Sequence, residues 1–215
     1  SAAKLFNWPD RSQPGAAAML APEAASSFSV SNHGKTYTFT IRKGFRFSDG
    51  APVTAKNFAY AIDRVANHDL ESPGAGFITD PSGTDIVGAR AVNNGRALHV
   101  RGVTARGNRL VIRLTRADPS FLTKLTMPFF QATSTELPLT HEVTGAYPSA
   151  GPYAFTRNDA DVLTSIRRNP FWVRGPGRMR PRHLAGLDVH WGLDEQASFG
   201  QVQANQLDEA SPPSA

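Results

Sequence analysis

The chain has 215 residues, of which 40% are hydrophobic, and its 18 glycines and 16 prolines indicate a protein rich in turns. A chain of this length can bury a sizeable core, and no segment approaches the roughly 18 consecutive apolar residues that a membrane-spanning helix needs. The sequence contains no cysteine, which excludes disulfides, thiolate metal sites and a cysteine nucleophile.

The segment from residue 37 to 58 carries the clearest local pattern. Tyr37, Phe39 and Ile41 alternate with polar residues, which predicts a strand with one apolar face. The Asp-Gly pair at 49–50 predicts a tight turn. A helix is then expected over residues 55–66, with Thr54 as its N-cap. The apolar stripe of this helix should consist of Phe58, Ile62 and Val65.

The middle of the chain is expected to alternate loops, strands and a helix. Residues 67–94 are rich in Gly, Pro, Asp and Ser, which predicts a long loop with little regular structure. Strands are expected over 97–103 and 109–114. Asp118 and Pro119 should open the next helix as its N-cap and first helical residue. The buried residues of that helix should be Phe121, Leu122 and Leu125.

The sequence of the last third of the chain predicts a linker, three strands and a helix. Residues 135–149 contain several prolines and are expected to connect two subdomains. A helix is expected from Glu195 to about Gln206 with Asp194 as its cap, and residues 211–215 should be disordered. The three strands are expected over residues 153–156, 162–168 and 187–191.

Asp188 and His190 are close enough in sequence to suggest a metal site. On a strand these two side chains project from one face, while Leu187, Val189 and Trp191 project from the other. A half-buried strand explains this pattern without a metal, and we prefer that interpretation.

Signatures of catalysis and of nucleic-acid binding are absent from the sequence. There is no Gly-x-Ser-x-Gly elbow, no Gly-x-x-x-x-Gly-Lys-Ser/Thr loop and no His-Glu-x-x-His helix. The net charge of +5 includes a basic cluster that prolines and glycines break into a loop, with no aromatic side chains between the charges for stacking. We therefore expect no enzyme activity, cofactor, metal or nucleic-acid partner. The cluster consists of Arg174, Arg178, Arg180, Arg182 and His183.

Four segments, taken in order, carry a family resemblance. Residues 37–58 resemble the pattern YTF-x-(L/I)-R-x-G-x-x-F-(S/N)-DG-x-P-(V/L)-TA-x-(D/N), residues 149–153 look like (S/T)-GPY, and residues 168–172 look like RNP-x-(Y/W). Residues 205–208 are similar to the ending G-x-(I/L)-D. These patterns resemble the family 5 solute-binding proteins, the extracytoplasmic receptors of peptide, dipeptide and nickel ABC importers. The resemblance covers residues 5 to 208.

The resemblance implies an α/β fold class. The chain is similar to the first lobe of a type II periplasmic-binding-protein-like receptor of the peptide-binding class, with mixed sheets, short flanking helices and the second lobe absent. Ligands of such receptors lie in the cleft between two lobes that close around a hinge. A larger subdomain is implied for residues 1–20 and 137–210, and a smaller one for residues 21–136.

The resemblance also implies a function, namely the substrate-binding component of an ABC importer for oligopeptides. The implied partners are a peptide or other small solute, the ABC permease subunits and the missing second lobe. The implied location is extracytoplasmic, with membrane contact only through a lipoprotein anchor of the parent or through the permease. Two alternatives stay open: a non-transport binding or sensing module on the same fold, and a hydrolase of unrecognised type.

The cleft side of the lobe is expected to carry residues from two segments. Trp8 should either narrow the cleft or fill the core, and Phe77 should form either a cleft wall or a core anchor for its own loop. The residues implied to contact the ligand are Asn7, Trp8, Pro9, Ser72, Gly76 and Phe77.

Overall fold

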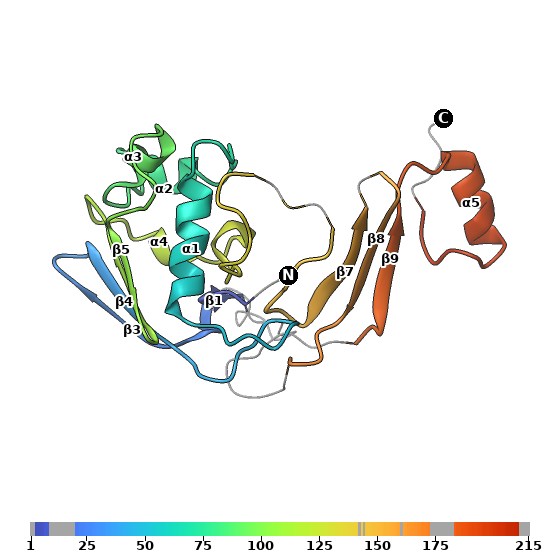
Figure 1. Cartoon of the computed structure of the whole chain (residues 1–215), viewed down its shortest axis with the longest axis horizontal. Coiled ribbons are helices and arrows are strands. Elements are labelled where there is room, and N and C mark those ends of the chain that lie inside the picture. The colour runs from blue at the N-terminus through green and yellow to red at the C-terminus, as the bar shows by residue number, and fades with distance from the viewer. Residues whose placement is uncertain are drawn as a thin grey trace.

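The computed structural model describes residues 3–8, 20–141, 143, 145–159, 161–172 and 183–210. These residues form a body built on a four-stranded sheet, and a three-stranded sheet stands beside that body (Figure 1). The expected α/β lobe with short flanking helices is confirmed, and all pairings between the described strands are antiparallel.

The sheet of the body contains the predicted apolar strand at its centre. That strand is β4 (Thr36–Ile41), and its side chains Tyr37, Phe39 and Ile41 are buried as predicted. The strand order is β3-β4-β6-β5. The other three strands are β3 (Ala25–Ser31), β5 (Val103–Arg106) and β6 (Arg109–Arg113), and a separate pair consists of β1 (Phe6–Asn7) and β2 (Ala21–Pro22).

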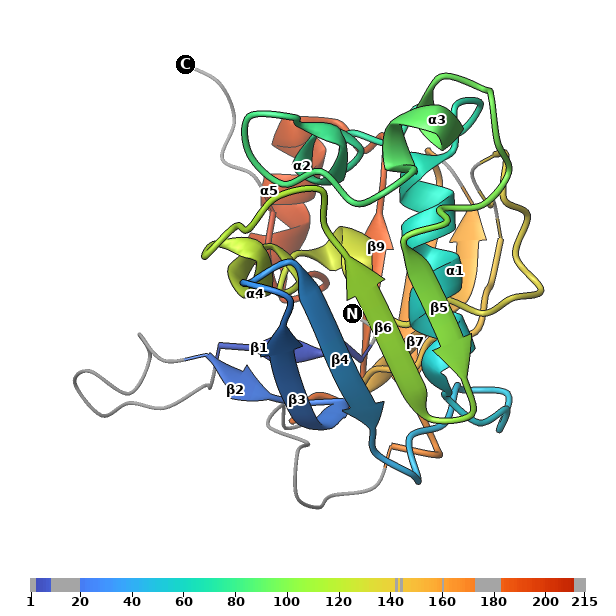
Figure 2. The same cartoon turned by 90° about the vertical axis from the view of Figure 1, so that its left-hand side faces the viewer.

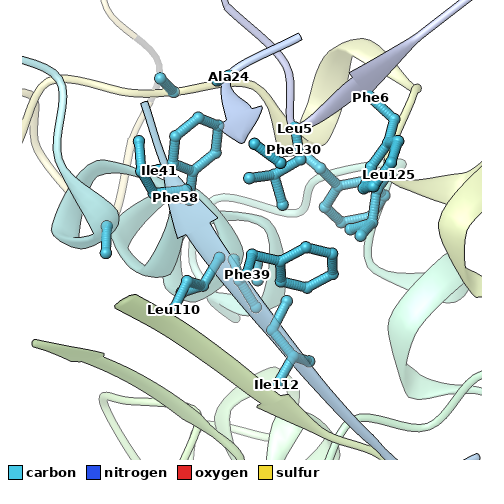
Figure 3. Close-up of a cluster of buried hydrophobic side chains, with 14 of the residues drawn as sticks. Leu5, Phe6, Ala24, Phe39, Ile41, Phe58, Leu110, Ile112, Leu125 and Phe130 are labelled. Atoms are coloured by element: carbon cyan, nitrogen blue, oxygen red, sulfur yellow. The ribbon is translucent and has the colours of Figure 1, made fainter. Parts of the chain in front are cut away.

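Helix α1 (Ala55–Ala66) covers one face of this sheet, as Figure 2 shows behind β5 and β6. Its limits and its cap at Thr54 are those predicted, and the Thr54 amide donates to Oδ1 of Asn57 at 2.8 Å. The predicted stripe Phe58, Ile62 and Val65 is buried. Figure 3 shows Phe58 in one cluster with Phe39 and Ile41 of β4. Burial of these large side chains is the main stabilising contribution to the body.

The strand predicted before residue 103 is wrong because backbone groups there find other partners. Residues 97–102 form no strand, since the amide of Val100 donates to Oδ1 of Asp63 and the amide of Gly102 donates to the Val87 carbonyl, both at 2.7 Å. The expected loop over residues 67–94 contains two short helices, α2 (Gly76–Thr79) and α3 (Ala89–Asn93).

The start predicted for the next helix is also wrong. Helix α4 (Phe121–Lys124) has Ser120 as its N-cap, because Oδ1 of Asp118 accepts from the Ser120 amide at 2.9 Å and forms a separate turn before the helix. Phe121 and Leu125 are buried as predicted.

The three-stranded sheet has the order β7-β8-β9. Its strands are β7 (Tyr153–Asp159), β8 (Leu163–Arg168) and β9 (Gly186–His190). Helix α5 (Glu195–Gln203) follows, and Oδ1 of its predicted cap Asp194 accepts from the Ala197 amide at 2.9 Å.

The prediction of a half-buried β9 is wrong. Leu187 is 48% exposed and Trp191 is 52% exposed, so the apolar side of this strand is uncovered in the described part of the chain. On the other side, Asp188 pairs with Arg167 at 2.9 Å. In Figure 1 β9 is the outer strand of its sheet, and α5 lies beyond it.

A buried asparagine joins the three-stranded sheet to the body. Asn169 has no exposed surface, and its side-chain amide donates to the carbonyls of Ser149 at 3.1 Å and Gly151 at 2.9 Å. The backbone amide of Asn169 donates to the Pro152 carbonyl at 2.9 Å. The Ser48 amide donates to the Ser149 carbonyl at 2.9 Å as well. The side-chain amide of Asn169 also donates to the Arg46 carbonyl at 3.4 Å, which links the base of β7 and β8 to the 45–53 turn.

Two aromatic rings complete this junction. Trp172 is buried and meets Phe45 edge to face with 5.8 Å between ring centroids. Phe171 lies against Gly50, where an added Cβ would come within 3.1 Å of the ring, and Gly50 has a φ of 91°. Glycine fits this position because it tolerates the positive φ and the close approach of the ring.

Some predictions are not tested by these residues. Arg174, Arg178, Arg180, Arg182 and the tail 211–215 lie outside the described residues. The division into two subdomains stays a prediction, and β1 contributes Phe6 to the same buried cluster as β4. Among the residues that the structure describes, no helix is long and apolar enough to cross a membrane.

The central position of β4 predicts the effect of a single truncation. Phe39→Ala should lower the free energy of unfolding by about 3 to 5 kcal/mol, because it removes a fully buried ring and leaves a cavity. Urea unfolding followed by circular dichroism measures this change, and Thr38→Ala on the opposite face is the control, with an expected change within about 0.5 kcal/mol. A loss under about 1 kcal/mol for Phe39→Ala would contradict the central role of this strand.

Candidate functional site

The first segment predicted to contact the ligand, residues 7–9, begins at the last residue of strand β1. Asn7 pairs with Ala21, is almost buried, and accepts the Trp8 amide on its own Oδ1 at 3.0 Å. The carboxamide of Asn7 thus orients the backbone of Trp8, whose side chain is 42% exposed. Trp8 therefore lies at the surface and does not fill the core, while Pro9 lies outside the described residues.

The second segment is the loop that leads into α2. Ser72 shapes this loop, because its hydroxyl accepts from the Gly74 amide at 3.2 Å and its carbonyl accepts from the Ala75 amide at 3.0 Å. Gly76 is open to solvent, with nothing within 4 Å of an added Cβ. Phe77 is 37% exposed, so it too lies at the surface and not in the core.

Phe129 supports this second segment, and sequence reasoning did not identify it. Its ring stacks on Phe77 with 6.1 Å between centroids. An added Cβ on Gly74 would come within 2.6 Å of the same ring, so the loop backbone lies directly on Phe129. Phe129 belongs to the 3₁₀ helix η2 (Pro128–Phe130), and only the tertiary contact reveals its role.

The segment that contains η2 also contacts the start of the chain. The Ala132 amide donates to the Ala3 carbonyl at 2.8 Å, and Phe130 is buried in the cluster that holds Leu5 and Phe6 (Figure 3). Both predicted segments are thus positioned by residues 128–132. The described residues show no direct contact between Trp8 and Phe77, so the structure does not join the two halves of the predicted site.

The surface of these two segments is partly aromatic and partly open backbone. It presents exposed aromatic rings, which contact apolar side chains, and a glycine with open space beside its backbone. Across the described residues there is no group of three His, Asp or Glu side chains placed to hold a metal ion.

A polar network holds the loop between α2 and α3 against α4. Thr84 donates to Oδ2 of Asp118, and Lys124 Nζ donates to the Thr84 hydroxyl at 2.6 Å and to the same Asp118 oxygen at 3.1 Å. Ser120 donates to the other carboxylate oxygen through its amide at 2.9 Å and its hydroxyl at 2.7 Å. Burial by itself would raise the pKa of Asp118, but these hydrogen bonds hold that pKa well below its usual range.

The comparisons with known proteins decide the family. The sequence matches the family described as "Bacterial extracellular solute-binding proteins, family 5 Middle" over residues 19–215. The chain belongs to this family. It is 27% identical over 202 residues to the dipeptide-binding protein DppE of Bacillus subtilis and 30% identical over 203 residues to the oligopeptide-binding protein OppA of the same organism. These alignments cover 89% and 88% of this chain but 35% and 34% of the relatives, so the chain spans about a third of their length.

Solved structures agree on the fold. The clavulanic acid biosynthesis oligopeptide binding protein 2 superposes with a TM-score of 0.72 at 25% identity, covering 95% of this chain and 37% of that protein. Listeria monocytogenes OppA bound to peptide gives the same TM-score at 15% identity, covering 96% of this chain and 40% of that one, and it shows the fold alone. The family resemblance and the periplasmic-binding-protein-like lobe predicted from sequence are therefore confirmed.

The Asp118 network predicts how stability depends on pH. The lowered pKa means that ionised Asp118 stabilises the fold above the unfolded-state pKa of about 4, and that this contribution is lost as pH falls below that value. Asp118→Asn should lower the free energy of unfolding by about 1 to 2 kcal/mol at neutral pH and by less at about pH 3.

Urea unfolding at both pH values measures this difference. Asp69→Asn is the matched control, because Asp69 is exposed and its side chain makes no hydrogen bond or ion pair with a described residue. A loss for Asp118→Asn that is equal at both pH values would contradict the proposed contribution of the ionised carboxylate.

Proposed function

We propose that the parent of this chain is the receptor component of an ABC importer for oligopeptides, and that the chain supplies part of its first lobe. The observation that carries the proposal is the family match together with relatives whose names describe dipeptide and oligopeptide binding. Family 5 proteins are extracellular solute-binding proteins, so the proposed place of action is outside the cytoplasm, beside the ABC permease.

The surface described above suits a peptide ligand. Peptide receptors commonly grip the ligand backbone by hydrogen bonds and accommodate its side chains in tolerant apolar pockets. We assign the exposed rings of Trp8 and Phe77 to ligand side chains, with Asn7 orienting Trp8 and Phe129 supporting Phe77. Ser72 and Gly76 would shape the loop, and Pro9 stays a prediction.

The uncovered apolar side of β9 supports the proposal that the chain is one part of a two-lobed protein. Large hydrophobic side chains rarely stay this exposed in contiguous groups on a complete protein. We propose that the remaining two thirds of the parent cover this surface and supply the second wall of the cleft. The exposed residues on and after β9 are Leu187, Trp191, Leu193 and Phe199.

Weak ligand binding by the isolated chain follows from the missing wall. A ligand that contacts one lobe loses about half of its contacts, while the cost of immobilising a flexible peptide stays largely the same. Isothermal titration calorimetry with a library of tri- to pentapeptides should give dissociation constants on the order of millimolar or weaker for this chain. The full-length parent is the control and should bind members of the same library at least about a hundredfold more tightly.

Light scattering on the calorimetry sample tests the uncovered surface. The chain should self-associate as its concentration rises, because the open edge of β9 and its apolar side chains favour pairing with another chain. Micromolar peptide binding by a monomeric chain would contradict the proposal that the site needs a second lobe. Absence of peptide binding by the full-length parent would contradict the proposed ligand class.

A further inference from the structure

A hollow of about 340 Å³ is lined in part by residues of α3 and of the turns beside it. Figure 1 shows α3 at the end of the body away from the three-stranded sheet. Three arginines line the hollow, namely Arg90, Arg96 and Arg101, together with Asp85, Asn94 and Thr115. A hollow of this size is within the range of small-molecule sites, and none of the residues assigned to peptide lines it.

A buried carboxylate holds the first arginine in place. Asp85 is nearly inaccessible to solvent, and its Oδ2 pairs with Nη2 of Arg90 at 3.0 Å and accepts from the Thr115 hydroxyl at 3.1 Å. The Arg90 guanidinium is therefore oriented at the wall of the hollow by a nearly buried carboxylate. Such prior orientation lowers the entropy that a ligand must remove on binding.

The other two arginines keep their donors available. The side chains of Arg96 and Arg101 make no hydrogen bond or ion pair with any residue in the described part of the chain. Arg101 crosses closely over Gly88, where an added Cβ would come within 2.8 Å of Cγ of Arg101. Gly88 has a φ of 88°, so glycine at this position permits both the turn and the path of the arginine stem.

The net positive charge of the lining favours an anionic ligand. Three arginines and one aspartate leave a net charge of +2 on the lining, and Arg113 adds a further guanidinium nearby, since its Nη2 donates to the Arg101 carbonyl at 2.9 Å. Each guanidinium presents a planar fork of donors that matches the oxygens of a phosphate group. The lining contains no aromatic side chain on which a nucleobase could stack.

We propose that this hollow binds a small anion through its phosphate group, with Arg96 and Arg101 as the direct contacts and Arg90 as a third contact positioned by Asp85. A free phosphate ester and the headgroup of an anionic lipid present the same chemistry. The site is independent of the peptide-binding proposal, because it uses none of the residues assigned to peptide.

Two probes separate these sources of phosphate. Glycerol 3-phosphate is titrated into the chain by calorimetry, and vesicles of phosphatidylglycerol are compared with vesicles of phosphatidylcholine in a sedimentation assay. Arg96→Gln and Arg101→Gln are the test variants. Arg106→Gln is the matched control, because it removes the same charge from an exposed position at the hairpin between β5 and β6.

Saturable binding is expected with glycerol 3-phosphate or with phosphatidylglycerol vesicles, weakened about tenfold by each test variant and unchanged by the control. Binding to soluble phosphate identifies a free ester, and binding to vesicles alone identifies a lipid headgroup. Absence of saturable binding to both probes would overturn the proposal. An equal loss in Arg106→Gln would also overturn it, because it would show a general charge effect without a site. Thermal unfolding of all three variants verifies that they are folded.

Discussion

The hydrogen bonds of one buried asparagine determine how the two parts of this structure are held together. Asn169 donates to the carbonyls of Ser149 and Gly151 where the chain enters β7, and the Ser149 carbonyl also accepts from the Ser48 amide. Buried carbonyl groups without partners cost free energy, so the side chain at this position is strongly constrained. Trp172 and Phe45 then exclude water from the same place. Three of the motifs that resemble the family in sequence therefore meet at one junction in space.

Sequence patterns predicted the elements whose partners are local. The alternation at 37–41 and the helical stripe at 58–65 depend on one periodicity each, and both elements formed as expected. The errors arose where tertiary partners override local preference. Val100 donates to Asp63, a residue of α1, which removes the expected strand. Residues 187–191 have the alternation of a half-buried strand, yet Leu187 and Trp191 are exposed in the described part of the chain.

The candidate site was predictable to a lesser degree for the same reason. The segments around Trp8 and Phe77 came from the family resemblance; both rings lie at the surface, and their role in binding stays a prediction. Phe129 carried no signal in the sequence, because its contacts with Phe77 and Gly74 join positions about fifty residues apart. The hollow lined by three arginines could not be predicted from the sequence for the same reason. Its residues come from a loop, a short helix and positions next to strands, which lie together only in the fold.

Hydrogen exchange measured by mass spectrometry on Asn169→Ala tests the central role of the junction most directly. Removal of the carboxamide leaves the Ser149 and Gly151 carbonyls without this partner, so the base of the three-stranded sheet should loosen. Amides of β7 and β8 are expected to lose protection by about tenfold or more, while amides of β4 and β6 keep theirs. Unchanged protection in β7 and β8 would contradict the conclusion that Asn169 holds this sheet to the body.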